Sequence, residues 1–185
     1  QKNYSELQYW GHRSNGSSCL EDIEGGLASN AKGYGIAVIV HDPWRPAPAI
    51  GGHLSPNPGE ADRSIIDKRL DIATFTSLPF ERSFTLQGIP SLELEAFADQ
   101  KGFDLCMALS ITNEDLTKIT QLSTGILRVL GEDAKKPAKR KIEFFPLFAD
   151  FKKGTRLRIS IAGAAWPSIG INPGNEAEYC KAPSP

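Results

Sequence analysis

The stretch FKKGTRLRISIAGAAWPSIGINPG, residues 151–174, decides the fold class of this chain. In its first half apolar residues alternate with polar ones, the period of a strand with one face on a core and the other in water. The apolar set is Leu157, Ile159 and Ile161, and the polar set is Arg156, Arg158 and Ser160. From Gly163 onward small residues, a Trp-Pro pair and an Asn-Pro-Gly turn replace the alternation, and such residues bend a chain sharply. The stretch therefore predicts a half-buried strand that runs into a rigid loop.

Short strand patterns recur along the rest of the chain. The apolar run Tyr34–His41 predicts a strand buried on both faces. Further strands are expected at Tyr4–Trp10 (an edge strand), Leu70–Ser77, Phe84–Gly88, Leu92–Ala98, Leu105–Thr112, Leu116–Leu122, Gly125–Leu130 and Ile142–Leu147. A helix over Asn113–Leu122 competes with the strand at Leu116–Leu122, since Thr112 or Asn113 could cap it.

About nine or ten short strands separated by Gly and Pro turns, without a long helix, indicate an all-β fold. An antiparallel β-sandwich is the expected architecture, and a jelly roll is the version that fits best. A length of 185 residues suits one domain over residues 1–185. The first residue is Gln rather than Met, so we expect a piece of a longer protein.

Composition excludes several classes of partner. The formal net charge is −1, and the basic residues of Glu132–Lys141 lack interleaved aromatics, so we expect no nucleic acid and no anionic membrane surface. No apolar run approaches the length of about 20 residues that a membrane helix needs. Three cysteines without a CxxC spacing argue against disulfides and a zinc site, and predict a cytoplasmic protein.

Motifs for catalysis are missing from the sequence. It has no Gly-x-Ser-x-Gly elbow, P-loop, HExxH or dinucleotide fingerprint, so we expect no cofactor and no metal. A Ser-His-Asp triad is defined by geometry and could use scattered residues, but the only histidines, His12, His41 and His53, each lie in or beside a predicted loop. Cys106, in a predicted strand, is interpreted as a small buried hydrophobe.

The segment Asp42–Pro58 is a long proline-rich loop that cannot be a helix or a central strand. Long loops in compact domains often carry function. The pair Gly51-Gly52 permits close backbone approach, and His53 and Leu54 would project from a proline-stiffened arm. These four residues form the candidate site; the alternative is a loop that only covers the edge of the sandwich.

The stretch 151–174 also resembles a known family. Its Phe, Gly-x-Arg, alternating strand, aromatic-Pro pair and Asn-Pro-Gly turn are similar to the C-terminal domain of X-Pro dipeptidyl-peptidases and cocaine-esterase-like serine hydrolases. The family usually has His at Thr155 and often Asp-x-Asp-Phe at 102–105. Further similar segments follow in the same order: Asp42-Pro43 with Gly51-Gly52, Thr76–Pro79, Leu86–Gly88, Phe103–Leu105 and Gly125–Arg128.

This resemblance implies a galactose-binding-domain-like jelly roll that follows an α/β-hydrolase domain in the same chain. The catalytic Ser, Asp and His would belong to that upstream domain, so the chain would hold no catalytic residue and be inactive alone. It would pack on the hydrolase domain and help shape the substrate pocket through Gly51, Gly52, His53 and Leu54, and a homo-oligomer is a further expectation. The alternative is an independent carbohydrate-binding or other ligand-binding module, with Trp10, Trp44 and Trp166 as aromatic platforms.

Overall fold

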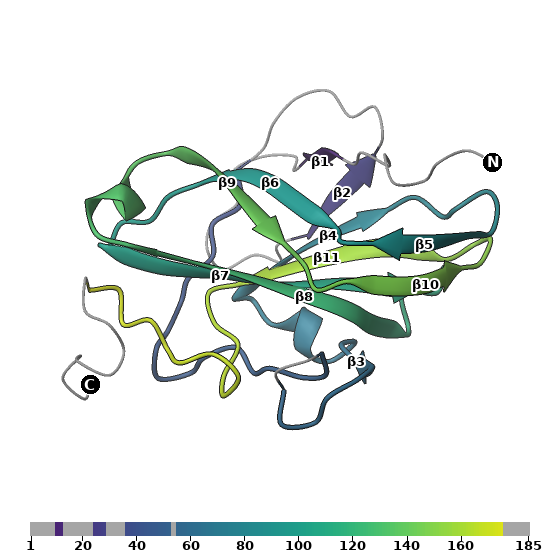
Figure 1. The fold of residues 1–185 in the computed structure, drawn as a ribbon, viewed down its shortest axis with the longest axis horizontal. Coiled ribbons are helices and arrows are strands. Elements are labelled where there is room, and N and C mark those ends of the chain that lie inside the picture. Colours follow the sequence, from purple (N-terminus) through teal and green to yellow (C-terminus); the bar gives the residue numbers. More distant parts are fainter. Residues whose placement is uncertain (1–9, 13–23, 29–35, 53–54, 176–185) are drawn as a thin grey trace.

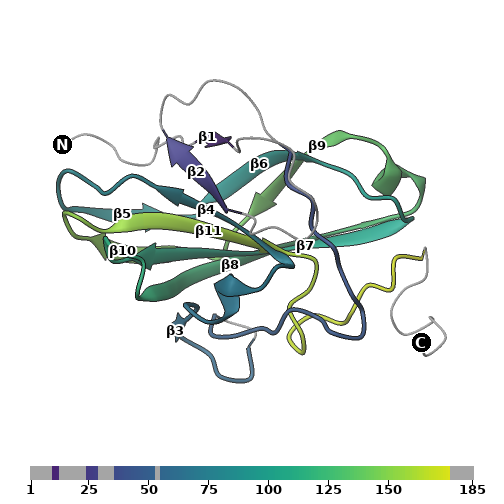
Figure 2. The ribbon, with the colours of Figure 1, turned by 180° about the vertical axis from the view of Figure 1, so that it is seen from behind.

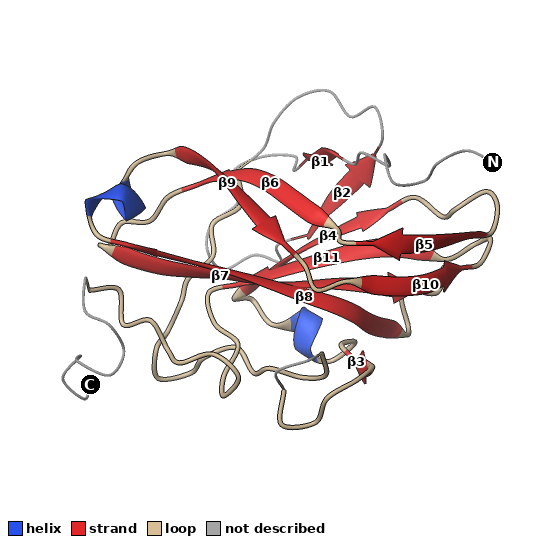
Figure 3. Cartoon of the chain, in the orientation of Figure 1, coloured by secondary structure: helices blue, strands red, loops and turns tan. Residues whose placement is uncertain are grey.

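The structure is a computed structural model, and it describes residues 10–12, 24–28, 36–52 and 55–175. The strands and the two 3₁₀ turns (η2 and η3) are β1 Trp10–His12, β2 Glu24–Ala28, β3 Ala61–Asp62, η2 Ile66–Lys68, β4 Ile72–Ser77, β5 Phe84–Gly88, β6 Ser91–Ala96, β7 Gly102–Thr112, β8 Ile119–Leu130, η3 Glu132–Lys135, β9 Ala138–Glu143, β10 Leu147–Phe151 and β11 Arg156–Ala162. The described part of the chain is all-β apart from the two 3₁₀ turns, as the sequence predicts (Figure 3).

The strands form two layers. A seven-stranded sheet has the order β1-β2-β4-β11-β7-β8-β3, and two smaller pairs, β10-β5 and β6-β9, lie over one of its faces (Figure 1). All pairings are antiparallel except β2 with β4, which is parallel and departs from the predicted antiparallel sandwich. The layers enclose one main core, to which β7, β9, β10 and β11 contribute buried apolar residues. An all-β sandwich is therefore confirmed, while the jelly-roll connectivity stays a prediction.

β11 is the centre of this arrangement. It pairs with β4 on one side and with β7 on the other, so its backbone is hydrogen-bonded on both edges. Leu157, Ile159 and Ile161 face the core, as their alternation predicts. The prediction that the other face is exposed to solvent is wrong, because Arg158 is only 4% exposed and Ser160 only 1%. Loops cover that face, and a buried carboxylate hydrogen-bonds to both side chains.

The aromatic residue that opens the decisive stretch anchors the second layer. Phe151 is 1% exposed and ends β10, where it pairs with Phe84 of β5. The rings of Phe84 and Phe151 stack with centroids 5.1 Å apart, and the Phe80 ring meets both edge-on. Such contacts add to the burial of large apolar surface, so this cluster ties the strand pair β10-β5 to the core.

Several predicted elements need correction. The described residues of the predicted strand 34–41, residues 36–41, lie outside the sheets, with Ile36, Val38 and Val40 exposed and Ala37 and Ile39 packed on the core. The predicted helix Asn113–Leu122 is wrong: a turn leads into β8, because the Asn113 side chain accepts a hydrogen bond from the Lys118 amide. The predicted strands Leu116–Leu122 and Gly125–Leu130 are parts of one strand, β8, which begins only at Ile119.

Two further boundaries differ from the prediction. The predicted strand Ile142–Leu147 is two strands, since β9 ends at Glu143 and β10 begins at Leu147, beyond Pro146, which lacks an N–H for a ladder. The basic segment Glu132–Lys141, whose composition favours a solvated loop, partly forms β9, where Lys139 and Lys141 lie opposite Glu95 and Glu93. Opposite charges across a strand pair are favourable, so the basic residues are accommodated in a sheet. The predicted strand Tyr4–Trp10 lies outside the described residues, except for Trp10, which begins β1.

Candidate functional site

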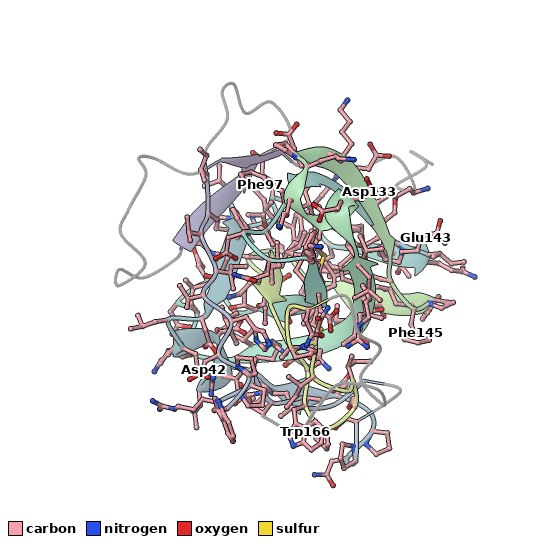
Figure 4. The ribbon with its side chains drawn as sticks, turned by 90° about the vertical axis from the view of Figure 1, so that its left-hand side faces the viewer. Asp42, Phe97, Asp133, Glu143, Phe145 and Trp166 are labelled. Carbon is pink, nitrogen blue, oxygen red and sulfur yellow. The ribbon has the colours of Figure 1, made fainter. Side chains whose placement is uncertain are left out.

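The face of the large sheet opposite the second strand layer carries irregular chain (Figures 1 and 2). We call residues 42–52, 55–71 and 163–175 the loop layer. Its first and third ranges are joined by backbone hydrogen bonds: the Trp166 amide donates to the Ala47 carbonyl at 2.9 Å, and the Ala49 amide donates to the Trp166 carbonyl at 2.7 Å. Figure 4 shows Trp166 on this side of the molecule and Phe97 and Asp133 on the opposite side. The predicted loop Asp42–Pro58 is thus ordered against the sheet over its described residues.

The paired glycines of the predicted site have backbone conformations that favour glycine. Gly51 has a φ of +54° and Gly52 a φ of +73°. A Cβ added at Gly51 would lie 2.6 Å from both the Ala61 Cβ and the Gly59 carbonyl oxygen. Gly52 and Gly59 exchange backbone hydrogen bonds of 2.7 and 3.1 Å. The chain therefore turns here in a space that admits no side chain at Gly51. The other two predicted site residues, His53 and Leu54, lie outside the described residues.

A buried polar side chain of the large sheet supports this turn. Gln121 of β8 is 2% exposed, and its Nε2 donates to the Ile50 carbonyl at 2.6 Å. The same nitrogen would lie 3.1 Å from a Cβ at Gly51 and 3.3 Å from one at Gly52. Arg63 Nη1 donates to Gln121 Oε1 at 2.8 Å, which fixes the orientation of the amide. The position of the paired glycines is therefore set by a strand residue.

Arg63 belongs to a buried ionic network on the outer face of the sheet. Its Nε lies 2.9 Å from Asp67 Oδ1, and Arg158 Nε lies 3.0 Å from Asp67 Oδ2. Ser160 Oγ donates to the same Oδ2 at 2.8 Å, and Arg158 Nη1 donates to Thr76 Oγ1 at 2.9 Å. Burial lowers the pKa of Arg63, and Asp67 opposes this shift. One carboxylate on η2 thus links β11 to the loop layer.

A second buried carboxylate holds the C-terminal part of the loop layer. Arg128 of β8 makes a bidentate pair with Asp104 of β7, at 2.8 and 2.7 Å, and also donates to the Gly170 carbonyl. Asn172 Nδ2 donates to Asp104 Oδ1 at 3.0 Å, and the Asn172 side-chain oxygen accepts from the Gly174 amide. The Asp104 hydrogen bond raises the pKa of Arg128. The Asn-Pro-Gly turn predicted from the sequence is therefore fixed by side-chain bonds to two strands.

Between the loop layer and the sheet lies a half-open cavity of about 70 Å³. Its walls are mostly small or aliphatic side chains from both loops and from β7 and β8, among them Ala49, Ile50, Ala108, Ile126, Ala162 and Ala165. Cys106, Gln121, Arg63 and Ser168 also line it. The cavity begins directly beside Gly51, so the candidate loop and the cavity share a wall.

The described residues offer little for catalysis. Burial raises the pKa of the Cys106 thiol to about 12, and the nearby Asp104 adds to this, so the thiol is not a nucleophile at neutral pH. His41 Nε2 lies 3.2 Å from the carbonyl of Asn172, a backbone partner and not a Ser or Asp. Within the described ranges no three His, Cys, Asp or Glu side chains gather as metal ligands, and no helix is long and apolar enough to cross a bilayer.

The sequence predicted a site at the paired glycines but did not identify the residues that hold their turn in place. Arg63, Asp67 and Gln121 lie in segments with no chemical motif, and Arg158 and Asp104 fall in strands where a charge suggests solvent. One signal was present: charged residues recur on the face of β7, β8 and β11 opposite the core. The same pattern is typical of an antiparallel sheet with one face in water, so it did not by itself identify a covered polar face.

Comparison with known proteins supports the resemblance seen in the sequence. The family described as the X-Pro dipeptidyl-peptidase C-terminal non-catalytic domain matches residues 7–185. Among curated proteins, no sequence matches this chain.

Two solved structures share the fold. An α-amino acid ester hydrolase is similar over 87% of this chain and 31% of its own, with a TM-score of 0.72 and 18% identity. An aminopeptidase from a marine sediment Thaumarchaeota archaeon is similar over 95% of this chain and 32% of its own, with a TM-score of 0.70 and 17% identity. The chain therefore spans about a third of the length of these proteins. With the family match across most of its residues, it belongs to the X-Pro dipeptidyl-peptidase C-terminal non-catalytic domain family.

Proposed function

We propose that this chain is the C-terminal accessory domain of a serine hydrolase, and that it packs on an upstream α/β-hydrolase domain and helps shape its substrate pocket. The whole protein would cleave X-Pro dipeptides or acyl esters through an acyl-enzyme formed in the other domain. Residues 1–185 would be one galactose-binding-like jelly roll in a cytoplasmic protein that assembles as a homo-oligomer. The similarity to chains about three times as long supports the existence of an upstream part.

The observation that carries the proposal is an apolar strip on the surface. Burial alternates along residues 36–40: Ala37 and Ile39 pack on the core, and every second side chain faces away from it. On that side Ile36 is 67% exposed, Val38 49% and Val40 52%. We call these three residues the apolar strip. Contiguous exposed apolar residues mark interaction sites, because leaving them in water is unfavourable.

The strip continues toward the loop layer. Asp42 ends the segment in a turn, where its side chain accepts from the Trp44 amide at 2.9 Å, and Trp44 is 71% exposed. Exposed aromatic and aliphatic residues at the edge of the layer that holds Gly51 are the composition expected of an interface core. The upstream hydrolase domain is the occupant we assign to this surface, because about two thirds of each similar chain lies outside the matching region.

Docking on this surface would bring the Gly51–Leu54 loop toward the hydrolase domain. Ligand pockets are common between domains, and a turn held by a buried network positions its neighbours with little conformational freedom. Leu54 would then contact the apolar part of the substrate. In the whole protein, Leu54→Ala should change the ratio of kcat/KM between large and small acyl groups, while Leu78→Ala, at an exposed position elsewhere, should not. An unchanged ratio would remove Leu54 from the pocket.

The strip is tested in the same protein. Val38→Asp places a charge in the docked surface and should weaken packing between the domains, because a buried unpaired charge is strongly unfavourable. We expect earlier cleavage between the domains in limited proteolysis and a lower Tm of the hydrolase domain. Phe148→Asp is the matched control, since Phe148 is 70% exposed on the second strand layer. Equal effects of the two changes would contradict the assigned surface.

A further inference from the structure

Two hydrogen-bond donors of the cavity in the loop layer lack acceptors among the described residues. Ser168 Oγ is buried and has no partner there. Arg63 uses Nε for Asp67 and Nη1 for Gln121, whereas its Nη2 makes no hydrogen bond to any part of the chain that the structure describes. Both side chains line the same cavity. Because buried polar groups in proteins are nearly always satisfied, the buried Ser168 hydroxyl calls for a partner in the cavity, and Arg63 Nη2 is a second donor available to the same molecule.

The charge of the site points to an anion. Arg63 is 7% exposed, and Asp67, the carboxylate with which it forms an ion pair, also forms an ion pair with Arg158. Burial lowers the pKa of Arg63, and the charge of Arg158 lowers it further. Arg63 keeps its ion pair with Asp67, and a negative group in the cavity would add a second charge-assisted hydrogen bond to the same guanidinium.

The size and walls of the cavity narrow the class of anion. A volume of about 70 Å³ is roughly half of the ~150 Å³ of an engineered apolar cavity that holds benzene. The walls carry alanine and isoleucine methyl groups, which suit an aliphatic group, and the polar side chains Ser55, Gln121 and Thr124. Arg63 is the one charged side chain among the described lining residues, which suits a singly charged group better than a doubly charged phosphate or sulfate. Guanidinium and hydroxyl groups together match the two oxygens of a carboxylate.

We propose that this cavity binds a carboxylate carried on a short aliphatic group, with the Arg63 guanidinium and the Ser168 hydroxyl as donors and the alanine-rich wall around the aliphatic part. Acetate and propionate have this chemistry, and so does an Asp or Glu side chain from another domain. The site is independent of the proposed docking role, because it is built entirely from residues of this chain.

Titration of the 185-residue chain with sodium propionate tests the site, with the Arg63 Nε–H and the Gly51 and Ala165 amides followed by NMR at constant ionic strength. Saturable shifts confined to residues around the cavity are expected. Propionamide, a neutral molecule of the same shape, should produce none. Absence of saturation with propionate, or equal binding of propionamide, would overturn the proposal and leave water as the occupant.

Variants separate a bound carboxylate from a general charge effect. Arg63→Met should weaken propionate binding at least about tenfold, because it removes a charge-assisted hydrogen bond. Arg69→Met is the matched control: Arg69 is also paired to an aspartate, Asp71, but does not line the cavity, so affinity should stay unchanged. If Arg63→Met does not fold, Ser168→Ala and the cavity-filling Ala165→Val carry the test, and both should weaken propionate binding. Wild-type affinity in both variants would contradict the site.

The same titration on the longer protein distinguishes the source of the carboxylate. If the natural ligand is a free acid, propionate should bind with similar affinity in the isolated chain and in the longer protein. If an Asp or Glu side chain of the other domain fills the cavity, propionate should bind only to the isolated chain. Either result supports a carboxylate site and identifies its occupant.

Discussion

At Gly51 both the backbone conformation and the packing of neighbouring atoms exclude a side chain. Its positive φ of +54° disfavours any side chain, and a Cβ would meet backbone and side-chain atoms at 2.6 Å. Gly131 offers a matched control, because its φ is +79° but nothing lies within 4 Å of an added Cβ. Conformational strain alone costs roughly 1–2 kcal/mol per residue in the left-handed region.

Gly51→Ala should therefore destabilise the chain by more than Gly131→Ala does. We expect about 1–3 kcal/mol for Gly131→Ala from strain alone, because its φ of +79° and ψ of −167° are nearly confined to glycine. The loss for Gly51→Ala should be larger because the clash with the Gly59 carbonyl is added. Urea unfolding of the two variants measures the difference. Equal losses would show that the turn at Gly51 has more room than the structure gives it.

Asp67 is the buried charge on which the outer face of the sheet depends. Its side chain is 1% exposed and bonds to two guanidinium groups. Asp67→Asn would leave both guanidiniums short of charge, and removing one partner of a buried ion pair typically costs about 3–5 kcal/mol. Asp71→Asn, which affects a pair whose carboxylate side chain is 24% exposed, should cost about 1 kcal/mol or less. A loss at Asp67 no larger than that at Asp71, measured by chemical unfolding, would contradict the structural role of the network.

At the scale of elements, alternation in the sequence predicted which residues of β11 face the core. It did not predict what lies on the other face, because burial by loops depends on contacts between segments far apart in the chain. Asp67 meets Arg158 across 91 positions, and Asn172 meets Asp104 across 68. Polar residues in these strands therefore looked solvated in the sequence and are buried in the fold.

The segment at 36–40 shows the opposite error. A run of aliphatic residues was interpreted as a strand buried on both faces, but these residues pair with no strand in the described structure, and every second one is exposed. Apolar character alone does not distinguish burial in a core from burial against another domain. The paired glycines were found because their chemistry is local, whereas Gln121, which holds them, is 70 positions away from Gly51 and carries no motif.

Arg128 connects two strands to the C-terminal part of the loop layer, so its loss should release that segment first. In Arg128→Met, hydrogen exchange of the amides in residues 163–174 should accelerate, while exchange in β7 and β11 should change little, since those strands keep their backbone ladders. Lys101→Met is the control, because the Lys101–Glu132 pair is exposed on both sides. Uniform acceleration over the whole chain would show that the pair supports the fold and not one segment.

For the molecule as a whole, the two strand layers form a body that holds a loop layer in place, and the loop layer carries both the paired glycines and the cavity. The chain belongs to a family of non-catalytic domains, and the apolar strip is the surface that we propose for a neighbouring domain. A domain of this kind acts by positioning, so its effects should appear in the specificity and stability of the protein that contains it.

The most direct test of this account is hydrolysis of X-Pro and acyl-ester chromogenic substrates by the purified 185-residue chain, beside the longer protein. We predict no turnover above the blank for the chain alone and turnover for the longer protein. Turnover by the isolated chain, abolished when one of its own serines or histidines is changed, would contradict the account.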